Sequence, residues 1–70
     1  MNETELTILA RLKNHYETIE QTNQHIKYLM GKTKDNYALD QLEDMYHELE
    51  IAMRSINYAL MNFKEYQKIK

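Results

Sequence analysis

The sequence has no cysteine and no proline, and Gly31 is its only glycine. Without cysteine, disulfide bonds, zinc ribbons and thiol chemistry are excluded, so the staples of many small secreted domains are missing. Because the two strongest helix breakers are nearly absent, we expect helix along almost the whole chain.

Long apolar runs are also missing, since no stretch approaches the roughly 20 residues that a membrane span needs. The first residues, Met1 to Glu5, are polar and acidic, unlike a signal peptide. We therefore expect a soluble, cytoplasmic protein that does not bind membranes. The net charge is -2, and the sequence lacks the clustered basic residues that bind phosphates. A nucleic-acid partner is therefore not expected.

The length of 70 residues allows one domain, residues 1–70, and so short a chain buries too little surface to be comfortably stable alone. Support from a partner surface is therefore expected.

A heptad pattern predicts a helix over about residues 37–68. Its a and d positions are all apolar or aromatic: Leu39, Leu42, Tyr46, Leu49, Met53, Ile56, Leu60 and Phe63. The neighbouring g positions, Ala38, Met45, Ala52, Ala59 and Tyr66, widen this stripe, whereas the e positions Glu43, Glu50, Asn57 and Lys64 are polar. An amphipathic helix with this stripe needs an apolar partner.

A second heptad pattern predicts the partner helix over about residues 3–30. Its a and d positions are Leu9, Leu12, Tyr16, Ile19, Asn23, Ile26 and Met30, with Ile8, His15, Thr22 and Leu29 at g. Asn2 and Glu5 have the spacing of a capping box. Gly31 is placed for a left-handed C-terminal cap, and Asp35 or Asn36 for the next N-cap. The short link makes the helices antiparallel.

An antiparallel register in which paired residue numbers add to about 69 brings apolar residues together along the whole hairpin. The same register places Asn23, the one polar a/d residue of the series, opposite Tyr46. We expect these two residues to fix the register, with the amide hydrogen-bonded to the tyrosine hydroxyl.

The g rows of both helices remain uncovered in a lone hairpin. Two hairpins packed face to face would cover them, which predicts a homodimer with a four-helix bundle fold. The alternative is that another protein supplies the covering surface.

Further apolar residues lie on the outer side of the second helix. Ile51, Arg54, Tyr58 and Met61 form one strip at helical spacing, and Tyr37 lies on the same side. Their composition is typical of interface cores, so we predict that they bind a protein partner. Alternatively, they are isolated surface residues without a role.

An acidic segment, Asp40, Glu43, Asp44 and Glu48, also has two interpretations. It could present carboxylates to a basic surface, or it could be an ordinary solvated helix face, which is the interpretation that we favour.

Catalytic and metal-binding patterns are not found. His15, His25 and His47 occupy different faces, and no inward Glu-x-x-His pairs are present. We expect no cofactor, no metal and no enzymatic activity.

The predicted architecture resembles the helical-hairpin dimers typified by plasmid copy-number regulators, which bind paired RNA loops, although the outer faces here lack a basic and aromatic row. A fainter resemblance is to small two-helix sporulation phosphatases with a Ser-Gln-Glu-Leu-Asp motif. The comparable residues here, Tyr46 to Glu50, depart from the motif at the serine and the aspartate.

These features together predict a small regulatory or inhibitory protein, of bacterial or phage type, that binds a protein target through helix faces. The alternatives are an assembly scaffold or coiled-coil adaptor and, less favoured, an RNA-binding hairpin dimer.

Overall fold

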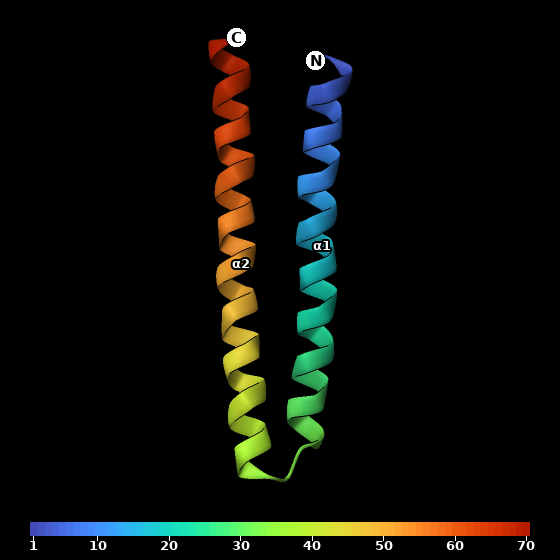
Figure 1. The fold of residues 1–70 in the computed structure, drawn as a ribbon, viewed down its shortest axis with the longest axis vertical. Coiled ribbons are helices and arrows are strands. Elements are labelled where there is room, and N and C mark those ends of the chain that lie inside the picture. The colour runs from blue at the N-terminus through green and yellow to red at the C-terminus, as the bar shows by residue number, and fades with distance from the viewer.

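A computed structural model describes residues 1–70 as two long helices and a short link. Helix α1 spans Glu3–Lys32 and helix α2 spans Asn36–Ile69, with residues 33–35 between them. The helices run side by side and antiparallel, so both termini lie at one end and the turn at the other (Figure 1). The molecule is 52 Å long. This confirms the predicted all-α hairpin, with helix bounds within two residues of those expected.

The start of α1 is closed by the predicted capping box. The Asn2 side chain accepts a hydrogen bond from the backbone N–H of Glu5 at 2.8 Å, and Glu5 Oε1 accepts one from the backbone N–H of Asn2 at 3.0 Å. Two of the N–H groups left free at the helix start are thereby satisfied.

The end of α1 differs from the prediction, because Gly31 is not a left-handed cap. No glycine has a positive φ, and the helix continues through Lys32. Thr33 ends it in an extended conformation (φ -85, ψ 130). Its backbone N–H and its hydroxyl both donate to the Leu29 carbonyl, at 2.9 and 2.7 Å, so the threonine supplies the cap expected of glycine.

The start of α2 follows the sequence prediction. Asp35 is the N-cap, and its carboxylate accepts a hydrogen bond from the backbone N–H of Tyr37 at 2.9 Å. The link of three residues contains both caps and is so short that the chain must reverse its direction between the two helices.

The core is the single seam between the two helices. Every predicted a and d residue is buried or half-buried, but only four residues of the chain are buried: Glu5, Asn23, Ile26 and Phe63. No side chain is completely enclosed. Two helices can cover each other along one stripe only, so the seam residues keep one edge open to solvent.

The predicted register is present at the centre of the hairpin, but the predicted Asn23 hydrogen bond is not. Asn23 and Tyr46 lie opposite each other, and Tyr16 shares a groove with Met53. The Asn23 Nδ2 group donates to the backbone carbonyl of Tyr46 at 3.4 Å, not to its hydroxyl. Asn23 Oδ1 is buried without a partner. A long bond and an unpaired acceptor make this amide a costly member of the seam.

The open end of the hairpin is closed by Glu5, whose side chain is only 4% exposed. Besides the Asn2 N–H, its Oε1 accepts a hydrogen bond from Lys70 Nζ at the end of α2. Lys70 is the main cause that lowers the Glu5 pKa, followed by the Asn2 backbone N–H and a smaller contribution from the Tyr66 hydroxyl, while desolvation acts in the opposite direction. Glu5 thus joins the two chain ends.

Gly31→Ala tests the new position of the helix end. The glycine is helical, and a Cβ there would meet nothing within 4 Å. Alanine should therefore raise the free energy of unfolding by about 0.5–1 kcal/mol, measured by urea denaturation, because it loses less backbone entropy. A destabilised variant would mean that the residue adopts the left-handed conformation after all.

Glu5→Gln tests the link between the chain ends. Since the folded-state pKa of Glu5 is lowered, its carboxylate stabilises the fold above the unfolded pKa of about 4.3, and this stabilisation is lost as pH falls through the folded pKa. Glutamine keeps the capping oxygen but not the charge. The variant should unfold at lower temperature than wild type at pH 7, with the difference shrinking below about pH 4.

The matched control is Glu3→Gln, which removes an exposed acid from the same first turn. An equal pH dependence in both variants would trace the effect to the helix dipole and not to the Lys70 contact.

Candidate protein-binding faces

The two sides of the hairpin differ in chemistry because the antiparallel arrangement brings like heptad rows together. The g rows of α1 and α2 lie on one side of the seam, which we name the g face, and the e rows lie on the other. Thr22 and Met45, both g residues, line one groove on the g face together with Ile26 and Leu49. Ile8 and Tyr66 line a second groove nearer the termini, beside Phe63.

The large residues of the g face remain accessible. Ile8, Leu29, Met45 and Tyr66 are 43–50% exposed, while Ala38, Ala52 and Ala59 are half-buried. His15 and Thr22 complete the rows and are exposed. Four large apolar side chains are thus accessible on this one face, with half-buried alanines among them.

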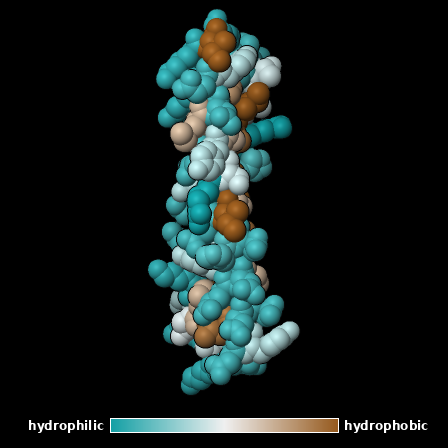
Figure 2. Space-filling view, turned by 90° about the vertical axis from the view of Figure 1, so that its left-hand side faces the viewer, coloured by the Kyte–Doolittle hydropathy of each residue, from teal (hydrophilic) through white to brown (hydrophobic).

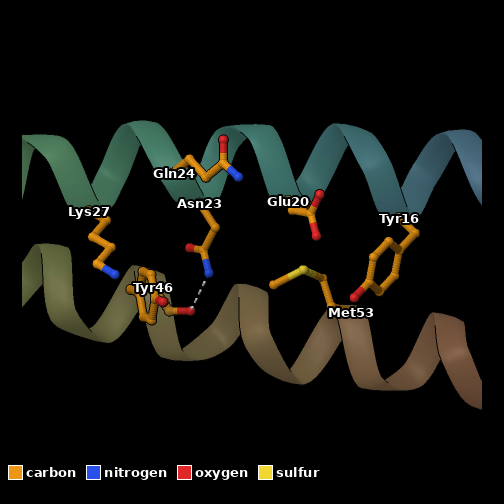
Figure 3. Close-up of a pocket in the computed structure, with 7 residues that line it drawn as sticks. All are labelled: Tyr16, Glu20, Asn23, Gln24, Lys27, Tyr46 and Met53. Carbon is orange, nitrogen blue, oxygen red and sulfur yellow. Dashed lines mark hydrogen bonds between the residues drawn. The ribbon is translucent and has the colours of Figure 1, made fainter.

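The opposite side carries a polar groove of about 260 Å³ that crosses the centre of the seam. Figure 3 shows its lining, with Glu20, Gln24 and Lys27 from α1 above Tyr46 and Met53 from α2. The unpaired Oδ1 of Asn23 is almost inaccessible, so the groove does not offer it to a ligand. This side therefore combines charged and polar residues with the apolar parts of Tyr16, Tyr46 and Met53.

The predicted partner-binding residues lie on the side of α2 that faces away from α1. Ile51, Tyr58 and Met61 are 45%, 65% and 59% exposed, and Arg54 is exposed beside them. Tyr37 is 74% exposed but lies two helical turns or more away from the others, next to the link. We name Ile51, Arg54, Tyr58 and Met61 the α2 strip.

The surface around the α2 strip is mostly hydrophilic. Figure 2 views the molecule from the α2 side and shows separate apolar areas on a hydrophilic background. Arg54 forms no ion pair within the chain, whose ion pairs are His47 with Glu50, Lys68 with Glu65, and Lys70 with Glu5. The strip therefore combines apolar anchors with a cation that has no carboxylate partner.

The four acidic residues are spread over the outer side of α2. Asp44 and Glu48 border the groove of Thr22 and Met45 on the g face, whereas Glu43 belongs to the e row on the other side of the seam. Asp40 is exposed on the outer side of α2. Asp40, Asp44 and Glu48 follow one another at four-residue spacing and are neighbours on the helix surface, and two of the four carboxylates border an apolar groove.

The histidines are also dispersed. His15, His25 and His47 are exposed, and no three His, Asp or Glu side chains lie close enough to hold a metal ion.

The structure reveals one residue pair that the sequence analysis did not single out. Glu5 occupies the d position four residues before Leu9 and is 97% buried, so it is the last member of the seam. Its assignment to the capping box concealed this second role. The heptad spacing could have indicated that Glu5 belongs to the seam, but nothing in the sequence identified Lys70 as the partner of Glu5.

Neither helix combines the length and apolar character needed to cross a membrane. Comparison of the chain with protein-family models, with characterised proteins and with solved structures finds no match, so its function is inferred from the geometry of these faces.

Proposed function

We propose that this protein is a small non-enzymatic regulator or inhibitor that binds a protein target through the α2 strip and acts as a homodimer joined through the g face. The observation that carries the target-binding part is the row of Ile51, Arg54, Tyr58 and Met61 held exposed on one rigid helix. A straight helix presents such anchors without an ordering cost on binding.

The composition of the strip suggests the chemistry of the target. Tyrosine and arginine are the residues most enriched at interface hot spots, and isoleucine and methionine supply apolar area around them. Because Arg54 has no carboxylate partner in the hairpin, the target surface should offer an apolar pocket next to an acidic group.

The homodimer is supported by the small core. A hairpin with four buried residues and no completely enclosed side chain gains stability if a second apolar face covers the g rows. A four-helix bundle is the arrangement in which two hairpins satisfy each other.

A scaffold or adaptor role is the second candidate, supported by the fact that apolar residues lie on two separate faces. A chain that associates through both would keep growing with concentration, whereas a regulator stops at a dimer. Sedimentation velocity at increasing concentration distinguishes the two. RNA binding is less favoured, since it requires retention on RNA that weakens steeply with salt.

The target-binding role is tested with an Ile51→Ala, Tyr58→Ala double variant. Both side chains are exposed, so their truncation should change the free energy of unfolding by no more than about 0.5 kcal/mol each. Loss of two anchors should weaken target binding by at least about 2 kcal/mol, roughly 30-fold. Affinity capture from the native cell, followed by titration of the recovered protein, measures this loss.

The matched control is Asn14→Ala, Gln21→Ala, which truncates two exposed residues on the outer side of α1. A target retained equally by both double variants would rule out the α2 strip as the binding surface. Loss of helicity in the Ile51, Tyr58 variant would instead assign these residues to the core.

A further inference from the structure

We infer that the second copy covers the g face with the two-fold axis parallel to the helices, so that α1 of each copy lies on α2 of the other and both turns lie at the same end. This inference rests on the proposed homodimer and specifies its geometry. When two such faces form an isologous interface with their helices aligned, the two-fold axis of the dimer lies in the interface plane. It runs either along the helices or across them.

The g face has the size of a stable interface. The hairpin measures 52 by 17 Å in its broad plane, a face on the order of 900 Å². Stable dimers bury about 800 Å² per partner, so one copy of the same hairpin matches the available area. A single covering helix would leave half of it open.

The g face is built of layers that each contain one residue from each helix. Thr22 and Met45 line the same groove, and steps of seven residues along each helix from this pair define the other layers. In each layer one helix supplies a larger residue than the other: Leu29 with Ala38, Met45 with Thr22, His15 with Ala52, and Ile8 with Ala59. Layers of this kind interdigitate when large residues meet small ones.

Only the axis along the helices brings large residues onto small ones in every layer. It keeps all residues at the same level, so Leu29 of one copy meets Ala38 of the other. The axis across the helices reverses the levels of the second copy and stacks α1 of one copy on α1 of the other. Leu29 of one copy then meets Ile8 of the other, and on the α2 side Ala38 meets Ala59. At both end levels of that bundle the α1 side would be overpacked and the α2 side would contain gaps, whereas the two central levels would still set a larger residue against a smaller one.

The composition of the rows that border the g face fits the same axis. On α1 the bordering row contains no acid: Thr4, Arg11, Thr18, His25 and Lys32. On α2 it contains no base: Gln41, Glu48, Ser55, Asn62 and Ile69. The axis along the helices sets these unlike rows against each other, with His25 of one copy between Gln41 and Glu48 of the other. The alternative sets Arg11 and His25 of the two copies together.

This arrangement fixes where the target-binding surfaces lie. The two α2 strips would occupy opposite corners of the bundle and run in the same direction. Two target molecules would then bind at equivalent positions related by the two-fold axis. Each dimer would therefore bind two copies of its target without either blocking the other.

The orientation is tested by the distance between spin labels on Lys34→Cys. The chain has no other cysteine, and Lys34 is exposed in the link, away from both faces. With the axis along the helices, both labels lie at one end of the bundle, and pulsed electron resonance should give a distance of about 30 Å or less. With the axis across them, the labels lie at opposite ends, near the molecular length of 52 Å.

A second label at Lys68→Cys, exposed at the other end, should also give a short distance. Dilution with unlabelled chain should abolish both signals, because they arise between copies. Long distances at both sites would overturn the orientation while leaving a dimer. Absence of any distance, together with a monomer mass in sedimentation, would overturn the dimer as well.

Discussion

The whole structure depends on the limited surface that two helices can hide from water when they have only each other. Each helix covers one stripe of its partner, and the a and d residues from Glu5 to Met30 and from Leu39 to Phe63 fill that stripe. The outcome is a seam with four buried residues and no completely enclosed side chain. Apolar residues just outside the stripe stay exposed, and they form the candidate binding faces of the hairpin.

Two polar residues, Asn23 and Glu5, are buried inside the seam, where a polar group costs stability. Asn23 is held by one long hydrogen bond to a backbone carbonyl, and Glu5 by its cap and by Lys70. An apolar residue at position 23 would pack with less cost, but it would pair equally well with other apolar residues in a shifted register. Both polar residues act at defined positions along the seam, one at its centre and one at its open end.

Much of the fold could be predicted from the sequence because heptad spacing determines which residues share a side of a helix. This spacing predicted both helices and, together with the short link that makes them antiparallel, the position of Asn23 opposite Tyr46. It could not determine which atom of Tyr46 the amide would reach, since ring orientation depends on local packing and not on spacing. Gly31 was misassigned because a helix can end on a threonine that bonds back to Leu29, and the sequence offered both residues within one turn.

The candidate faces were predictable in composition but less so in extent. Ile51, Tyr58 and Met61 are exposed together on one helix, as their spacing requires, and Asp40, Asp44 and Glu48 likewise follow one another on the outer side of α2 at four-residue spacing. Lys70 was not predictable as the partner of Glu5, because long-range ion pairs depend on the exact ends of both helices.

The central claim, that the hairpin completes its core with a second copy, is tested most directly by the dependence of thermal unfolding on protein concentration. If folding and association are coupled, the melting temperature must rise with concentration, by about 5 °C per tenfold for a dimer with an unfolding enthalpy of about 0.7 kcal/mol per residue. We predict this rise, with the mass of a dimer at the highest concentrations. A melting temperature that stays constant over a hundredfold range, with the mass of a monomer throughout, would contradict the account.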